Sequence, residues 1–374
     1  MKKTVRFFRS TVTIGKRFWI GAIALFPCLP AMADPLAGAT MAVFEANGPR
    51  EVELASTAMP TLTVFTPDGA REVDMQTNWP EIQGAGHLGI SVGPRYDRAA
   101  FAIGGHGSAN ILSELQWKVP AAEIRVDGQW THTSGFSIKG HLAYAAAVSG
   151  GEVRDSDYVY DDRQGEFSRS YANPDESRMF DISLGAGWRL PLGSTLALTP
   201  MFGVARYDSE YRQRDGDLTV WTRDYAKQLG PYYDYDQPLG RFTNLHSSYK
   251  PVWRSNWLGV DGEFKPSEQF TLRAGIKQHW FRYQAEANWN LRGSFAHPVS
   301  FLHQGHGQGW EADLGADWRL LGGHRLSLDL GMRELRVKDG TDTTFFYNGT
   351  SSEITLRTAT SDSWSARLGY RYEF

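Results

Sequence analysis

The last residues of the chain alternate strictly between apolar side chains and polar or small ones. From Trp364 to Phe374 every second residue is apolar, and the positions between carry Ser, Arg, Gly or Glu. In an extended strand this order places an apolar row on one face and a polar row on the other. The same alternation recurs at 180–190, 310–320 and 326–333. The chain is therefore expected to consist of many amphipathic strands.

Two all-β architectures bury such strands in different ways. A sandwich packs the apolar faces together, whereas a transmembrane barrel turns them toward lipid and keeps a polar lumen. Here aromatic residues such as Trp188, Trp318 and Phe374 lie near the ends of the apolar rows, and tight turns alternate with long polar stretches. These features favour an antiparallel transmembrane β-barrel over a secreted sandwich. A mean hydropathy of −0.41 excludes a membrane protein built from several apolar helices.

The barrel is predicted to occupy residues 84–374, with about ten strands, since single-chain barrels use an even number. Several predicted strands exceed the roughly 9–11 residues that cross a bilayer, so their ends are expected to project as a rim. The stretches 151–178, 214–247 and 288–308 are predicted to be long extracellular loops. The predicted strands are 84–103, 110–131, 136–150, 178–190, 195–213, 248–265, 269–287, 308–320, 325–338 and 359–374.

The N-terminus has the features of an export signal. Basic residues precede an apolar run from Phe18 to Leu29, and Ala31-Met32-Ala33 provides a small-x-small cleavage pattern. Residues 1–33 are predicted to be a signal peptide; lipidation at Cys28 is the alternative, although the preceding proline is bulky for such a site. Residues 34–83 alternate poorly, contain five prolines and are predicted to be an N-terminal extension.

The signal and the barrel together predict the outer membrane of a Gram-negative bacterium. The expected partners are outer-membrane lipid, with lipopolysaccharide as a candidate, and a peptide or protein at the cell-surface rim. The formal net charge of −3 gives no polybasic surface, so no nucleic-acid partner is expected. A monomer without a cofactor is expected. Side chains fill the lumen of barrels this narrow, which directs function to the rim and loops.

One pair of acidic residues stands out in the first long loop. Asp155 and Asp157 follow Gly150-Gly151 and are two residues apart. In an extended segment their side chains share one face, about 7 Å apart along the chain. Two such carboxylates repel, so one pKa rises and the pair can share a proton and hold a water. The alternative is two solvated loop acids.

Four segments, in matching order, resemble the omptin family of outer-membrane proteases. The resemblance covers roughly 84–374, and the start of the family's chain is matched further upstream, before an unusually long insertion. The segments are 65–68 (FTPD), 112–118 (LSELQWK), 150–157 (GGEVRDSD) with the aspartate pair, and 173–181 (NPDESRMFD).

The resemblance implies an aspartic-type endopeptidase that cuts peptide bonds with a water held between the Asp155–Asp157 pair and an Asp–His dyad. In omptins the dyad lies in the loop after the seventh strand. At those positions this chain carries Asn288 and Asn290, and neither can act as a general base. His297 is the candidate replacement base, but no aspartate precedes it. The candidate catalytic residues are Asp155, Asp157 and His297.

Two other functions stay open from the sequence. A catalytically silent, adhesin-type barrel would use the tyrosine-rich loops as a contact surface, since aromatic residues are enriched at interfaces. A narrow channel would conduct through the lumen. His303 and His306 are interpreted as solvated loop histidines rather than a metal site.

Overall fold

The computed structural model describes residues 40–45, 48–53, 62–66, 69–73, 83–105 and 111–374. The chain divides into two units, Met1–Pro80 and Glu81–Phe374. In the first unit, β1 (Thr40–Glu45) pairs with β2 (Gly48–Glu53), and β3 (Leu62–Thr66) pairs with β4 (Gly69–Val73), both antiparallel. The predicted signal peptide lies outside the described residues.

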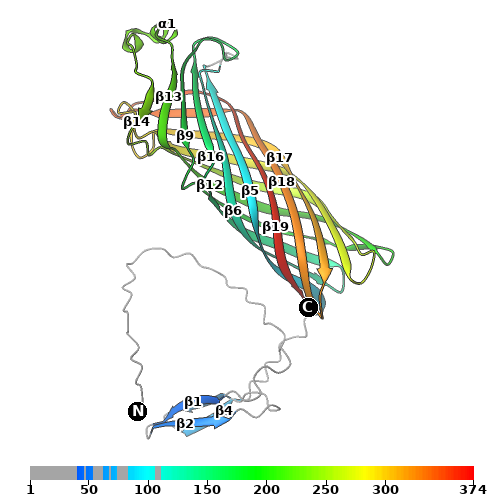
Figure 1. Cartoon of the computed structure of the whole chain (residues 1–374). Helices are drawn as coiled ribbons and strands as arrows, with labels where there is room; N and C mark the ends of the chain where they lie inside the picture. The colour runs from blue at the N-terminus through cyan, green and yellow to red at the C-terminus, as the bar shows by residue number, and fades with distance from the viewer. Residues whose placement is uncertain (1–39, 46–47, 54–61, 67–68, 74–82, 106–110) are drawn as a thin grey trace. The chain divides into compact units, whose positions relative to one another are not determined.

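The second unit is a closed antiparallel barrel of ten strands (Figure 1), which confirms the predicted fold class. Neighbouring strands follow one another in the chain, and β19 pairs with β5 to close the wall. Closure satisfies the backbone hydrogen bonds that lipid cannot. The ten strands are β5 (Gly84–Gly104), β6 (Ser113–His132), β7 (Phe136–Ala147), β10 (Arg178–Trp188), β12 (Leu196–Arg212), β15 (Ser248–Phe264), β16 (Phe270–Asn288), β17 (Phe301–Arg319), β18 (His324–Phe345) and β19 (Ser351–Glu373).

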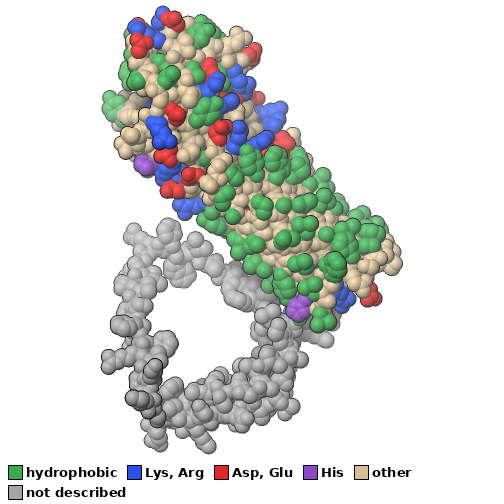
Figure 2. Space-filling model, viewed as in Figure 1, with side chains coloured by type: hydrophobic (Ala, Val, Ile, Leu, Met, Phe, Trp, Pro, Cys, Tyr) green, Lys and Arg blue, Asp and Glu red, His purple; other side chains and the backbone are tan. Residues whose placement is uncertain are grey.

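A band of apolar side chains covers the outer wall of the barrel (Figure 2). Phe202 is 63% exposed and Leu368 is 62% exposed, which in an outer-membrane protein means contact with lipid. Trp188 and Trp318 border the band at the end with the short turns, and Trp280 lies toward the opposite end. The short turns mark the periplasmic end and the long excursions mark the extracellular end.

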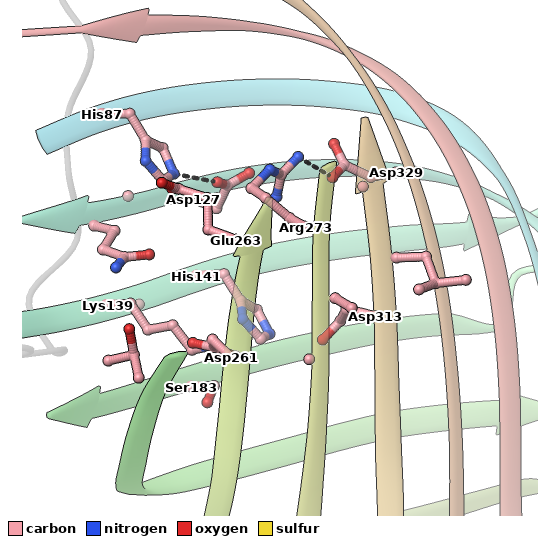
Figure 3. Close-up of a pocket in the computed structure, with 18 of the residues that line it drawn as sticks. His87, Asp127, Lys139, His141, Ser183, Asp261, Glu263, Arg273, Asp313 and Asp329 are labelled. Carbon is pink, nitrogen blue, oxygen red and sulfur yellow. Dashed lines mark hydrogen bonds and ion pairs between the residues drawn. The ribbon is translucent and has the colours of Figure 1, made fainter. Parts of the chain in front are cut away.

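The periplasmic half of the lumen holds a small polar cavity of about 110 Å³ (Figure 3). Its walls carry ion pairs rather than free charges. His87 Nε2 lies 3.3 Å from Asp127 Oδ2, Lys139 Nζ donates to Asp261 Oδ1 at 2.6 Å, and a guanidinium nitrogen of Arg273 donates to Asp329 at 2.8 Å. The cavity is thus a hydrated part of the lumen.

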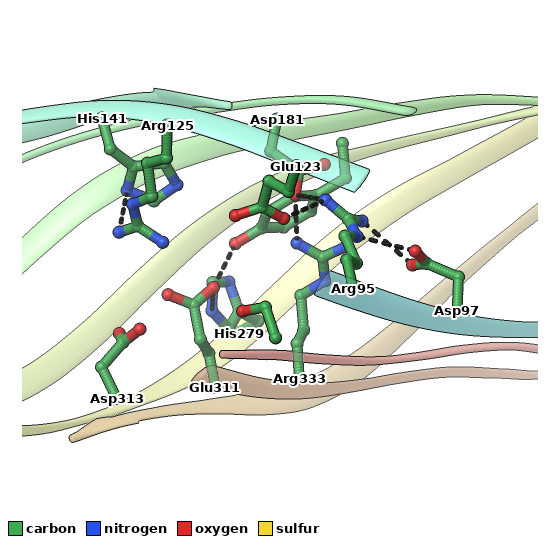
Figure 4. Close-up of polar contacts among 12 residues, drawn as sticks. Arg95, Asp97, Glu123, Arg125, His141, Asp181, His279, Glu311, Asp313 and Arg333 are labelled. Carbon is green, nitrogen blue, oxygen red and sulfur yellow. Dashed lines mark hydrogen bonds and ion pairs between the residues drawn. The ribbon is translucent and has the colours of Figure 1, made fainter. Parts of the chain in front are cut away.

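A layer of buried ion pairs fills the lumen further from the periplasm (Figure 4). Arg95 bonds to Asp97, Glu123 and Asp181, and Arg333 also donates to Asp181 at 3.0 Å. Above this layer, on the extracellular side, an aromatic core includes Trp117, which is fully buried. The two layers close the lumen, which argues against the narrow channel.

Two of the three predicted long loops are wrong, because they contain strands. The stretch 151–178 forms β8 (Glu152–Tyr158) and β9 (Glu166–Asn173), and 214–247 contains β13 (Arg214–Trp221) and β14 (Gly240–Phe242). In the stretch 288–308, residues 289–300 form a loop as predicted, and β17 begins at Phe301. These segments lie above the lipid, so neither face needs a continuous apolar row and the alternation that marks the lower strands is missing.

The extra strands build an extension of the wall that we call the arm, comprising β8, β9, β13, β14 and the connecting residues 159–165 and 222–239. β6 pairs with β7 along its lower part and with β8 along its upper part, and the sheet continues through β9 and β13 to β14. The arm ends in α1 (Arg223–Ala226) and two short helical turns, η1 (Lys227–Leu229) and η2 (Pro231–Tyr233). No helix in the described part of the chain is long and apolar enough to cross a membrane.

Asp181→Ala is expected to destabilise the barrel by about 3–5 kcal/mol, because it removes the carboxylate shared by two buried arginines. Denaturant unfolding in detergent measures the loss. Glu268→Ala, in an exposed periplasmic turn, is the control and should change stability by less than about 0.5 kcal/mol. Equal stability of the two variants would show that the lumen layer does not hold the fold.

Candidate functional site

The aspartate pair lies on β8, in the arm, rather than in a loop. Asp155 pairs with Leu115 of β6 and Asp157 pairs with Ser113. Because cross-strand partners share a face, both carboxylates point to the side of the sheet on which Leu115 enters the buried core. The two aspartates therefore face the inside of the rim.

Burial and mutual repulsion control the charge of this pair, which lies above the lipid-facing band. Burial raises the pKa of Asp155 well above its usual range, the charge of Asp157 adds to the rise, and Arg292 opposes it. Burial likewise raises the pKa of Asp157, while Arg292 and bonds from Ser113 and Ser168 lower it. Asp155 Oδ1 is buried without a hydrogen-bond partner in the described structure. The pair is suited to sharing a proton.

His297 has a different partner. Its Nδ1 donates to Asn288 Oδ1 at 2.8 Å, and the side chain is exposed. Within the described residues, no hydrogen bond or ion pair joins His297 to either aspartate. Of the three predicted catalytic residues, the structure brings together the two aspartates and leaves the histidine apart.

Asn290 is at the other position that corresponds to the omptin dyad. Its side chain forms hydrogen bonds that join the loop after β16 to residues 244–247. Its Oδ1 accepts hydrogen bonds from the His246 backbone at 2.8 Å and from Ser247 Oγ at 3.1 Å, and its Nδ2 donates to the Asn244 carbonyl. Every polar atom of this side chain is used structurally. Arg292, in the loop after β16, is exposed, and its positive charge opposes the rise in the pKa values of both aspartates.

The interpretation of His303 as a solvated loop residue is wrong. It lies on β17 with no exposed surface, and its Nδ1 lies 3.0 Å from the Tyr249 hydroxyl. Its Nε2 lies 3.5 Å from Oδ2 of Asp342, which is 1% exposed. No local sequence signal marks this His–Asp pair, because the two residues are far apart in the chain. The Phe101 ring packs on His303 with 4.6 Å between ring centroids, so the pair lies in the core.

No metal site replaces the missing base in the described part of the chain. His306 is exposed, whereas His303 is buried, because residues three apart in a strand face opposite sides of the sheet. The two histidines therefore cannot share a metal ion. Among the described residues, no three His, Cys, Asp or Glu side chains gather as metal ligands.

Comparison with known proteins gives the family. The family model described as "Pom: Protochlamydia outer membrane protein" matches residues 89–374. The chain belongs to this family. Comparison with curated protein sequences finds no match. The chain is thus an outer-membrane protein, as its barrel and lipid-facing band indicate.

Comparison with solved structures finds the fold in a protein of different sequence. The outer membrane protease OmpT from Escherichia coli is similar at a TM-score of 0.66 and 14% identity, covering 79% of this chain and 98% of that one. The translocator domain of the autotransporter NalP from Neisseria meningitidis has a TM-score of 0.33 at 14% identity, covering 78% of this chain and 88% of that one. The outer membrane protein OprG from Pseudomonas aeruginosa has a TM-score of 0.32 at 10% identity, covering 79% of this chain and 99% of that one. The likeness to OmpT is one of fold, and membership of the omptin family does not follow from it.

Asp155→Asn is expected to raise the unfolding temperature at neutral pH. Because the folded-state pKa is raised, the folded pair retains protons that the unfolded chain releases, and stability falls as the pH rises through this window. The gain from the substitution should shrink on acidification, when Asp155 is protonated in both states.

Thermal unfolding from mildly acidic to neutral pH measures this effect. Asp162→Asn is the matched control, since Asp162 is an exposed carboxylate at the end of the arm and its left-handed backbone (φ 53) tolerates asparagine. The control should show no pH-dependent difference. A gain of equal size at every pH would contradict the assignment to a buried charge.

Proposed function

We propose that this outer-membrane barrel is a catalytically silent surface-binding protein. One observation carries the proposal: in the described structure His297 bonds to Asn288 and not to the aspartate pair, while the positive charge of Arg292, from the same loop, acts on both carboxylates. A guanidinium stays protonated in proteins and cannot accept a proton from water. The aspartate pair therefore lacks, in the described structure, the histidine base on which omptin-type hydrolysis depends.

The omptin-like endopeptidase remains the competing function. It requires His297 to leave Asn288 and come within hydrogen-bond reach of a water on the aspartate pair. Absence of a general base typically costs about 10²–10⁴-fold in rate. A hydrolysis rate that far below a complete site would not sustain a surface protease.

A row of cations on the outer wall supports phosphate-bearing outer-leaflet lipid, with lipopolysaccharide included, as a partner. Arg206, Arg254, Arg282 and His306 are direct cross-strand neighbours on β12, β15, β16 and β17. Among the described residues, Arg206 has an acidic partner, Asp208, while Arg254 and Arg282 have none.

The place of this row suits a lipid headgroup. Trp280 is exposed on the same face of β16, two residues below Arg282, so the row borders the lipid-facing band at its extracellular end. Like charges directly opposite one another destabilise a sheet. A phosphate group between the arginines would remove this cost through charge-assisted hydrogen bonds.

Basic peptides incubated with the reconstituted barrel are expected to stay intact, and mass spectrometry of the peptides measures this. Lipid vesicles with phosphate-bearing glycolipid should be used, so that lost activity cannot be attributed to a missing lipid. Asp155→Ala and Asp157→Ala variants serve as controls. Cleavage that disappears in both variants would establish the endopeptidase and overturn the proposal.

The double variant Arg254→Gln and Arg282→Gln is expected to retain phosphate-bearing glycolipid at least about a hundredfold less tightly, since it removes two charge-assisted bonds of about 1.5–3 kcal/mol each. Native mass spectrometry or lipid quantification after purification measures retention. Arg319→Gln, an exposed arginine at the periplasmic end, is the control and should bind lipid unchanged. Equal loss in both variants would indicate a nonspecific charge effect.

A further inference from the structure

The end of the arm is unusually rich in tyrosine and acid. We define the arm tip as residues 158–166 and 222–240, which join β8 to β9 and β13 to β14. These stretches contain six tyrosines, six acidic residues and three basic ones. Tyr232 is 82% exposed, and Tyr160, Tyr225 and Tyr235 are also exposed. The arm tip therefore presents rings to the extracellular solvent, at the part of the barrel furthest from lipid (Figure 1).

The two stretches form one surface. The Tyr160 hydroxyl donates to Gln228 Oε1 at 2.8 Å, and the rings of Tyr160 and Tyr225 meet edge to face at 5.9 Å. Together, this hydrogen bond and this ring contact fix the position of the two loops relative to each other. Residues that are distant in sequence thus contribute rings and carboxylates to the same surface.

Internal contacts hold the longer stretch in place. Arg223 bonds to both Asp234 and Asp236, and Trp221 Nε1 donates to the Tyr235 carbonyl at 3.0 Å. The Trp221 ring also packs on Tyr235, with 5.1 Å between ring centroids. A surface ordered before binding loses less conformational entropy when a partner docks.

The charges of the arm tip are unbalanced in favour of acid. Its three cations are all engaged: Arg163 bonds to Glu114 of β6, Arg223 to its two aspartates, and Lys227 to Asp224. In the described structure, Asp161 and Asp162 are exposed and make no ion pair. The surface therefore offers negative charge and tyrosine faces without a free cation.

We propose that the arm tip docks a protein segment with clustered arginine and lysine side chains. Carboxylates accept charge-assisted hydrogen bonds from these groups, and tyrosine faces attract them through cation–π contacts. Tyrosine is also among the residues that most often carry binding energy at protein interfaces. The inference rests on the proposed function, since it names the partner that the silent barrel binds. An anionic polysaccharide would be repelled by this surface.

Fluorescence anisotropy of a labelled arginine- and lysine-rich peptide, added to the full-length barrel in detergent, tests the inference. Tyr232→Ala is expected to weaken binding about thirtyfold, the size of an interface hot spot. Asp161→Asn with Asp162→Asn should weaken binding and reduce its dependence on salt. All three side chains are exposed; in the described structure Asp161 and Asp162 make no ion pair, and the Tyr232 ring packs edge to face on Tyr233, with 5.5 Å between ring centroids.

Two controls make the result specific. Tyr347→Ala removes a tyrosine that is 75% exposed on another hairpin and should leave binding unchanged. A peptide of equal length with Asp and Glu in place of the basic residues should not bind. Equal binding by the wild type and both arm-tip variants would overturn the inference. So would Tyr232-dependent binding of a neutral polysaccharide with no binding of the cationic peptide.

Mass spectrometry of the peptide after each measurement separates this inference from the proposed function. A peptide cleaved by the barrel contradicts catalytic silence, whatever the arm tip binds. A peptide that stays intact but does not bind contradicts the docking surface alone.

Discussion

The need to pair every backbone polar group within lipid is the constraint on which the whole structure depends. A closed sheet meets it, and closure then fixes an apolar outer face, a polar inner face and two different ends. The inner face cannot remain as unpaired charges in so narrow a lumen, so Arg95, Asp181 and Arg333 form a buried layer that closes it. Everything that can meet a ligand from outside the cell is therefore carried above the lipid, on the rim and the arm.

The sequence predicts the part of the fold that lipid dictates. The alternation at Trp364–Phe374 and at 180–190 corresponds to β19 and β10, and the ten strands of the wall follow from the same pattern. Strands above the lipid, such as β8 and β13, carry no such pattern because their two faces do not meet contrasting surroundings. The cationic row is hidden in the sequence for another reason: Arg206, Arg254 and Arg282 become neighbours only through strand register.

The candidate site is predictable to a similar extent. The spacing of Asp155 and Asp157 is enough to place both carboxylates on one face, and β8 provides that geometry. Which charged side chain acts on the two aspartates depends on the path of the irregular loop after β16, which no local pattern encodes. The sequence therefore points to His297 and gives no sign of Arg292. The fold shared with OmpT therefore does not by itself carry over a catalytic site, because catalysis depends on a few side chains while the barrel depends on its pattern.

The most direct test of the account is a carbon-13 NMR titration of the Asp155 and Asp157 carboxyl groups in the wild type and in Arg292→Gln. The account predicts that the two groups titrate as a coupled pair, and that loss of Arg292 raises their pKa values because its positive charge favours the ionised forms. The signals of His297 should not respond to the pair. A histidine that titrates in step with the aspartates, together with an unchanged pair in Arg292→Gln, would contradict the account and restore the protease.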